Sequence, residues 1–144
     1  MTEVAFHFNA PDKLAYACRF ARKLARGDRR LVVTAPQPLL DTLDGMLWNL
    51  SPLDFIAHGG SGSTPEVLEA SPVLLLADAQ QHQGTREVLL NLGTDVPSGF
   101  GSYEHVIEVV SASDEHDRQQ ARERWRHYAA RGYAIVRHDL VLKS

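Results

Sequence analysis

Hydrophobic and polar positions follow two periods along this chain, one typical of strands and the other of helices. In residues 3–8, Val4, Phe6 and Phe8 recur at every second position, which predicts a strand with these side chains on one face. Residues 12–26 repeat their apolar positions at the spacing of an amphipathic helix. Similar patterns predict helices at 39–50 and 113–132 and further strands at 30–35, 72–78, 85–93, 103–110 and 133–142.

The order of these elements predicts the fold class. Strands alternate with helices at both ends of the chain and follow one another in the middle. We therefore expect a single α/β domain over residues 1–144, with a mostly parallel central sheet and helices on both faces. The expected architecture is Rossmann-like without a nucleotide site, because the first strand-to-helix junction, residues 6–13, has no glycine for a dinucleotide fingerprint.

Capping residues refine the ends of the expected helices. Gly27 suits the C-terminal end of the first helix, and Gly132 suits the end of the last one. Ser113 is the expected N-cap of the last helix, followed by acidic residues that suit the positive end of a helix dipole. Pro36 and Pro38 are expected to break the strand at 30–35 before the second helix begins.

Residues 58–64 form a glycine- and serine-rich segment, HGGSGST, that could hold an anion. No lysine follows at the spacing of a phosphate loop, and Ser63 stands where a nucleophile elbow needs glycine. We therefore expect a surface loop, preceded by at most a short strand within residues 54–65. The alternative is a small α/β nucleotide-binding protein or enzyme that uses this loop.

Net charge and composition argue against several classes of protein, including those that bind nucleic acid or membranes with their whole surface. The formal net charge is −3, which argues against nucleic-acid or membrane binding by the whole surface. The single cysteine, Cys18, cannot form an internal disulfide, is expected in the core, and fits a reducing cytoplasm. No apolar run reaches the roughly 18 residues of a membrane span, and the N-terminus has the pattern of a strand. We expect a cytoplasmic protein.

The sequence shows none of the residue spacings that are typical of metal sites or catalytic sites. The seven histidines form no H-x-H and no H-E-x-x-H pair, so a metal site is not expected. No spacing indicates a Ser/His/Asp arrangement or a pair of catalytic carboxylates. We therefore expect no catalytic residue, no metal and no cofactor.

The expected last helix carries an unusual number of arginines. On a helical wheel Arg118, Arg122 and Arg126 form one stripe along the edge of the apolar face, beside Trp125. Guanidinium groups bind carboxylates in pairs of hydrogen bonds, so the stripe suits an extended acidic peptide with a bulky apolar side chain. Phosphates on the arginines with bases on the indole, or a merely solvated edge, are the alternatives. Two further arginines stand on the other edge of that face, Arg124 and Arg131.

Three segments together resemble one protein family. LDGMLWNLSPLDFIAH (43–58), EVLLNLGTDVPSGF (87–100) and ARERWRHYAARGY (121–133) resemble, in this order, blocks of the chi subunit of the bacterial DNA polymerase III holoenzyme. The resemblance covers nearly the whole chain. It implies a non-enzymatic accessory subunit of the clamp-loader assembly, with an α/β fold.

The resemblance also implies a ligand for the arginine stripe. In that family, chi connects the clamp loader to single-stranded DNA-binding protein by binding the acidic C-terminal tail of that protein, which ends in an apolar residue. Little direct nucleic-acid binding is implied. The positions carried over to this chain for tail binding are Arg118, Arg122, Trp125, Arg126 and Trp48.

A second partner is implied on another face of the domain. In the family, the psi subunit ties chi to the clamp loader. Phe55, in the segment DFIAH, matches a family position at that contact, although Ala57 stands where the family often has proline. The alternative for Phe55 is a place in the core.

Overall fold

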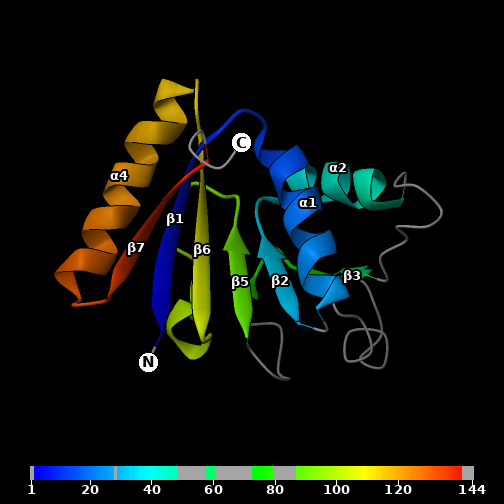
Figure 1. Cartoon of the computed structure of the whole chain (residues 1–144), viewed down its shortest axis with the longest axis horizontal. Helices are drawn as coiled ribbons and strands as arrows, with labels where there is room; N and C mark the ends of the chain where they lie inside the picture. Colours follow the sequence, from blue (N-terminus) through cyan, green and yellow to red (C-terminus); the bar gives the residue numbers. More distant parts are fainter. Residues whose placement is uncertain (1, 28, 49–57, 61–72, 80–86, 141–144) are drawn as a thin grey trace.

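A seven-stranded sheet organises the protein in our computed structural model, which describes residues 2–27, 29–48, 58–60, 73–79 and 87–140 (Figure 1). Its strand order is β3-β4-β2-β5-β6-β1-β7, and every paired strand in it runs parallel to its neighbour. The strands are β1 (Glu3–Ala10), β2 (Leu31–Thr34), β3 (His58–Gly60), β4 (Val73–Leu75), β5 (Val88–Asn91), β6 (His105–Ser111) and β7 (Ile135–Asp139).

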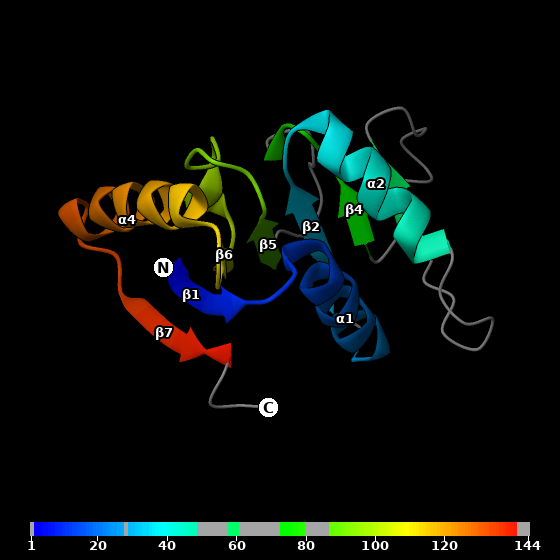
Figure 2. The same ribbon diagram turned by 90° about the horizontal axis from the view of Figure 1, so that it is seen from above.

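The helices of the described residues cover the two faces of this sheet. They are α1 (Lys13–Arg26), α2 (Gln37–Trp48) and α4 (Glu115–Ala130), with a short 3-10 helix, η3 (Phe100–Ser102), before β6. The connections through α1 and α2 lead toward the β3 edge, whereas the connection through α4 leads toward the β7 edge. Because such crossovers are right-handed, this reversal places α4 on the opposite face from α1 (Figure 2). The predicted α/β fold with helices on both faces is confirmed.

Alternation along β1 separates two hydrophobic cores. Val4 and Phe6 pack with residues of α4, whereas Ala5 packs on the other face with α1 and α2. The apolar side of α1 buries Ala17, Cys18 and Ala21, so the predicted core position of Cys18 is confirmed.

Two predicted helix starts need correction. Asp114, not Ser113, is the N-cap of α4, and its carboxylate accepts hydrogen bonds from the backbone N–H groups of His116 and Asp117. The helix α2 begins at Gln37, so Pro38 lies in its first turn rather than before it. A proline is tolerated there because the first N–H groups of a helix have no intrahelical acceptor.

A buried polar network fixes α4 on the sheet. The Arg124 Nε donates to Glu108 Oε1 at 2.9 Å, and the Tyr128 hydroxyl donates to Glu108 Oε2 at 2.6 Å. Asn91, on the neighbouring strand, donates to both carboxylate oxygens at 3.0 and 3.1 Å. The Arg124 and Glu108 side chains are 2% and 0% exposed. The prediction that Arg124 stands on the edge of the apolar face of the helix is therefore wrong, because this side chain lies at the centre of the buried face.

The network explains why the orientation of α4 could not be read from its apolar residues. Its buried positions are Asp117, Ala121, Arg124 and Tyr128, a face of which half is charged. This face is rotated by about 40° from the one that the apolar residues indicate. Trp125 consequently lies at the border of the interface, half-buried.

The protonation states of the network follow from burial and charge. Burial raises the pKa of the Glu108 carboxyl, while the guanidinium of Arg124 and the hydrogen bonds from Tyr128 and Asn91 oppose that rise. Burial also raises the pKa of the Tyr128 hydroxyl, and the adjacent Glu108 raises it further. The phenol therefore stays protonated and serves as a donor to the carboxylate.

Replacing Arg124 with methionine should lower the free energy of unfolding by about 3–5 kcal/mol, because the Glu108 charge is then buried without its cation. The loss should be larger near about pH 8 than near about pH 5. A carboxyl whose folded pKa is raised stabilises the fold while it keeps its proton, and this contribution is lost as the pH rises through that pKa. Urea denaturation followed by circular dichroism measures both effects.

The double variant Arg124→Met, Glu108→Gln should recover part of the lost stability at pH 8, because it removes the unpaired charge. Arg131→Met, which removes an exposed arginine after the same helix, is the control and should change stability by less than about 0.5 kcal/mol. A single Arg124→Met variant as stable as this control would contradict a structural role for the pair.

Candidate functional site

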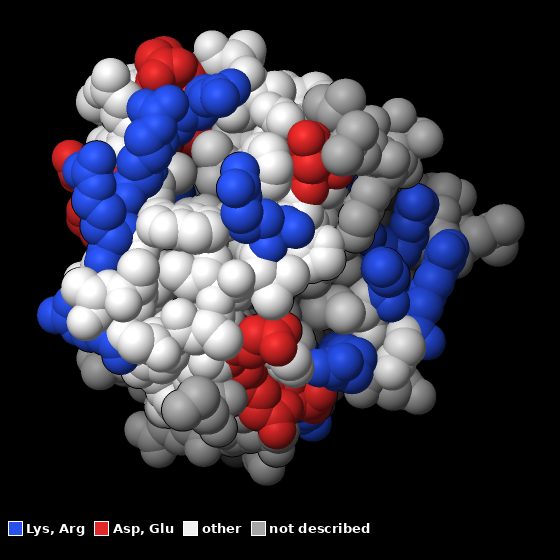
Figure 3. Space-filling view, turned by 60° about the vertical axis from the view of Figure 1, so that its left-hand side comes forward, with Lys and Arg blue, Asp and Glu red and all other residues white. Residues whose placement is uncertain are grey.

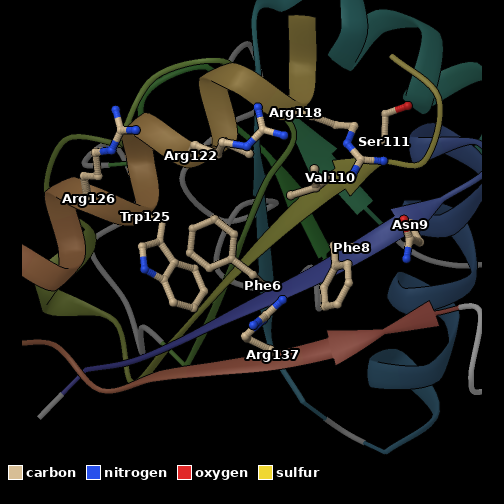
Figure 4. Close-up of a pocket in the computed structure, with 11 residues that line it drawn as sticks. Phe6, Phe8, Asn9, Val110, Ser111, Arg118, Arg122, Trp125, Arg126 and Arg137 are labelled. Atoms are coloured by element: carbon tan, nitrogen blue, oxygen red, sulfur yellow. The ribbon is translucent and has the colours of Figure 1, made fainter. Parts of the chain in front are cut away.

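A pocket opens between α4 and the β1 and β7 strands (Figure 4). Its volume is about 480 Å³. The pocket is lined by residues of the strands β1 and β6, the helix α4 and the edge strand β7. They are Phe6, Phe8, Asn9, Val110, Ser111, Arg118, Ala121, Arg122, Trp125, Arg126 and Arg137. The pocket therefore joins segments from both ends of the chain.

The floor of the pocket is aromatic. Alternation along β1 places Phe6 and Phe8 on the face that α4 covers. Phe6 is nearly buried and lies 5.0 Å from Trp125 between ring centroids, whereas Phe8 is half-buried. Because α4 packs mainly on β6, the floor beyond Trp125 remains open to solvent.

The arginine stripe predicted from the sequence forms one wall of the pocket. Arg118, Arg122 and Arg126 all line it, together with Trp125. Successive members are one helical turn apart, about 6 Å along the axis. Figure 4 shows the three arginines on α4 above the aromatic floor. The structure thus brings together four of the five residues that the sequence assigns to one site.

The three arginines differ in their local partners. The Arg118 Nη1 donates to the backbone oxygen of Ala112 at 3.0 Å, which holds this side chain near the start of the helix. The Arg122 Nη1 lies 3.3 Å from Glu115 Oε1, but the two side chains are 54% and 64% exposed. An ion pair so exposed exchanges readily with another carboxylate. Arg126 is also exposed.

Arg137 is a pocket residue that the sequence reasoning missed. It lies on β7, paired in register with Phe6 of β1, and its guanidinium is 5.3 Å from the Phe8 ring centre and 5.9 Å from that of Trp125. The predicted strand at 133–142 includes this residue. The strand alone does not reveal its neighbours, because they depend on the pairing of β7 with β1.

The electrostatics of the pocket contrast with the net charge of the chain. Four lining residues are arginines, and none of the described residues that line it is acidic. Figure 3 shows Lys and Arg side chains gathered over the α4 side of the molecule. A basic rim over an aromatic floor suits a ligand that combines carboxylates or other anions with an apolar group.

Trp48, the fifth residue of the predicted set, does not line this pocket. It ends α2, whose Leu40, Leu43 and Leu47 pack in the core that contains α1, on the opposite face of the sheet from α4. Figures 1 and 2 both place α2 and α4 at opposite ends of the sheet. Trp48 is nevertheless 57% exposed, an unusual state for a large apolar side chain.

Two other expectations fall partly or wholly outside the described residues. Phe55 lies outside them. Of the segment 58–64, the structure describes only His58–Gly60, which forms the edge strand β3. The surface loop expected for residues 58–64 is therefore wrong for these three residues, and the rest of the segment lies outside the described residues.

A second, smaller pocket lies at the carboxyl ends of the strands, where sheets of this kind bind nucleotides. Here the N-termini of α1 and α4 are occupied by the carboxylates of Asp12 and Asp114, which accept hydrogen bonds from the helix backbone. The same pocket holds an ion pair of 2.8 Å between Lys13 Nζ and Asp117 Oδ1, so the Lys13 ammonium is already paired. The capping carboxylates of Asp12 and Asp114 would repel a phosphate at the two helix N-termini.

Metal-binding clusters and membrane-spanning helices are both absent from the described residues. The described part of the chain holds no group of three or more His, Cys, Asp or Glu side chains suited to a metal ion. Among the same residues, no helix has both the length and the apolar character needed to cross a membrane.

Comparison with known proteins connects this architecture to a family. The family model described as "DNA polymerase III chi subunit, HolC" matches residues 1–136. The chain is 30% identical over 145 residues to the DNA polymerase III subunit chi of Pseudomonas aeruginosa, covering 97% of this chain and 98% of that protein. It is 24% identical over 120 residues to the subunit of the same name from Haemophilus influenzae, covering 83% and 81%.

Proposed function

Because the chain belongs to the family of the DNA polymerase III chi subunit, HolC, we propose that it binds the acidic C-terminal tail of single-stranded DNA-binding protein and links that protein to the clamp loader. The family is that of a non-catalytic accessory subunit of DNA polymerase III, which argues against an enzyme built on the segment 58–64. The observation that carries the tail-binding proposal is the pocket beside α4, with its basic wall and aromatic floor.

The spacing of the wall matches an extended peptide. Arg118, Arg122 and Arg126 repeat at about 6 Å along the helix axis. Alternate side chains of an extended peptide repeat at about 6.6 Å. A peptide that runs beside α4 can therefore present a carboxylate to each arginine in turn. The exposed Glu115, now beside Arg122, would be replaced by a carboxylate of the ligand.

Stable binding of the tail requires both the ion pairs with the arginines and apolar contacts with the aromatic floor. Exposed ion pairs contribute only about 0–1 kcal/mol each, so three of them do not account for stable binding. Burial of one large apolar side chain on Phe6, Phe8 and Trp125 adds about 1.5–3 kcal/mol. Guanidinium fork geometry adds hydrogen bonds stronger than those between neutral groups. A micromolar dissociation constant, about −8 kcal/mol, is the expected scale after the entropic cost of ordering the tail.

Direct binding of single-stranded DNA by the same pocket is less well supported. Proteins that bind single-stranded nucleic acid do so partly by stacking the bases on open aromatic faces. Trp125 is half-buried, with Phe6 at 5.0 Å and the Arg137 guanidinium at 5.9 Å from its ring centre. The indole therefore offers an edge and a partial wall rather than an open stacking surface.

The link to the clamp loader requires a second surface, and the end of α2 is the candidate. Trp48 is highly exposed and lies on the opposite side of the molecule from the pocket. A psi subunit or another clamp-loader component could bury this side chain without blocking the tail site, and exposed aromatic residues are frequent interface anchors. Phe55 follows Trp48 by seven positions in the sequence, and we propose it for the same contact.

Arg122→Ala should weaken binding of a labelled tail peptide about tenfold, because a hydrogen-bonded charge in the centre of the wall contributes about 1.5 kcal/mol. Arg131→Ala is the matched control. It removes the same charge from the same end of the chain but lies outside the pocket, so it should change the affinity by less than about twofold. Fluorescence anisotropy measures both. Equal losses in the two variants would indicate that only net charge matters, and no binding to wild type would remove the proposal.

Raising the salt concentration should weaken tail binding, because part of the attraction is Coulombic and screened over about 8–10 Å near physiological ionic strength. At physiological salt, a single-stranded oligonucleotide alone should bind at least about tenfold more weakly than the tail peptide, since the Trp125 indole is half-buried and the Arg137 guanidinium lies 5.3 Å from the Phe8 ring centre. Titrations of both ligands at two salt concentrations test this. A tighter complex with the oligonucleotide would favour direct DNA binding.

Trp48→Ala should leave the affinity for the tail peptide unchanged within about twofold, because Trp48 lies outside the pocket. Trp125→Ala should reduce it about tenfold or more by removing part of the apolar wall. Isothermal titration calorimetry on both variants separates them, with circular dichroism to check folding. A selective loss in Trp48→Ala would restore this residue to the tail site.

A further inference from the structure

The outward face of α1 carries a second row of cations, on the opposite face of the sheet from the pocket. Four residues form this row, which we call the α1 stripe: Arg19, Arg22, Lys23 and Arg26. Three of them are exposed and Arg22 is half-buried, and no residue of α1 is acidic. Figure 3 shows a group of Lys and Arg side chains on this side of the molecule, separate from the group over α4.

The stability of the helix does not explain the α1 stripe. Arg19 with Lys23, and Arg22 with Arg26, are pairs of like charges one turn apart, which repel each other. The helix dipole favours the two cations of the last turn, Lys23 and Arg26, but not the two before them. Among the described residues, neither Arg19 nor Lys23 forms an ion pair, and the Arg19 guanidinium lies over the Tyr16 ring at 5.8 Å. The arrangement therefore suits an anion from outside the chain.

We propose that the α1 stripe binds the phosphate backbone of single-stranded DNA, without regard to base sequence. The inference goes beyond the proposed function, because it adds a second ligand on a second surface. It does not depend on binding of the tail in the pocket beside α4.

The composition of the surface favours nucleic acid over a protein or a membrane. Protein interfaces have an apolar core inside their polar rim, and α1 exposes no large apolar side chain. A helix that lies on a membrane needs an apolar side facing the lipid. That side of α1 is buried in the core, with Ala17, Cys18 and Ala21. Interfaces with nucleic acid, by contrast, are polar and strongly positive.

The shape of the surface favours a single strand over a duplex. From Arg19 to Arg26 the α1 stripe forms a line about 10 Å long on the outside of one helix. A helix that reads duplex DNA enters the major groove, whereas α1 is packed on the sheet along its apolar side. A flexible strand can follow the line and bring successive phosphates to successive cations.

The affinity of this contact is low because it lacks a platform for the bases. The Tyr16 ring is half-buried and has the Arg19 guanidinium over it, so the attraction is mainly Coulombic. This agrees with the weak binding of an oligonucleotide expected above. Because α1 and α4 cover opposite faces of the sheet (Figure 2), a strand on α1 leaves the pocket accessible. A weak contact is then effective when another contact raises the local concentration of the strand.

The experiment titrates the full chain into a labelled oligothymidine of about 16 nucleotides. Four phosphate contacts predict that the affinity falls about twentyfold between about 50 and 150 mM salt. The double variant Arg19→Gln, Lys23→Gln should bind at least about tenfold more weakly at the lower salt, and its affinity should fall only about fivefold over the same range. It should bind the tail peptide as wild type does.

The matched control is the double variant Arg122→Gln, Arg126→Gln, which removes the same charge from α4. It should keep the affinity for the oligonucleotide within about twofold, because exposed charges on the far side of the molecule are screened. A duplex of the same length should bind wild type more weakly than the single strand does. Circular dichroism verifies that both variants fold.

The other outcomes would overturn the inference. Equal losses of oligonucleotide affinity in the two double variants would show that only net charge matters, and a loss confined to the α4 variant would place the DNA in the pocket. Tighter binding of the duplex would exclude the single strand as the preferred ligand. A loss of tail affinity in the α1 variant, with oligonucleotide binding intact, would make an acidic peptide the ligand of the α1 stripe. Failure of wild type to bind the tail peptide alone would remove the proposed function and leave this inference in place.

Discussion

The position of α4 depends on one buried ion pair. Arg124 reaches from the helix to Glu108 in the middle of β6, at 2.9 Å and with both side chains almost fully buried. Tyr128 and Asn91 supply the remaining hydrogen bonds to that carboxylate. Such a pair is costly to desolvate and contributes little net stability. It nevertheless restricts how the helix can pack, because either charge buried without the other would be strongly unfavourable. The pair therefore sets the rotation and the position of the helix along the sheet, with the Asp117 contacts to Lys13 and Ser111 at the helix start adding a second fixed point.

The pocket follows from that rotation. With Arg124 turned inward, Arg118, Arg122 and Arg126 project along the other edge of the helix, over the part of β1 that α4 leaves uncovered. Trp125 lies at the border, with one side packed on Phe6 and the other lining the pocket. The arginines of this helix thus have two unrelated roles: one stabilises the arrangement of the helix, and three provide a basic wall. A mildly acidic protein can in this way present a strongly basic site without a basic surface overall.

Much of this could be predicted from the sequence, and the failures have physical causes. Strand and helix periodicity gave the α/β class and most elements, and the i, i+4, i+8 spacing of Arg118, Arg122 and Arg126 correctly placed them together. The buried role of Arg124 could not be predicted, because its partner Glu108 lies in a different element, β6, and the sequence does not state which strand position the helix covers. Arg137 was missed because its neighbours depend on strand register. The separation of Trp48 from the pocket could not be predicted either, because a sequence pattern does not state on which face of the sheet a helix packs.

The most direct test of the account is a nuclear magnetic resonance titration of the isotopically labelled chain with the tail peptide. The chain has only two tryptophans, so the two indole N–H signals report separately on the pocket and on the end of α2. We expect the Trp125 signal and the backbone amides of α4 and β7 to shift together with one dissociation constant, while the Trp48 signal stays in place. Shifts centred on Trp48 and α2, or on the carboxyl edge of the sheet with α4 and β7 unaffected, would contradict it.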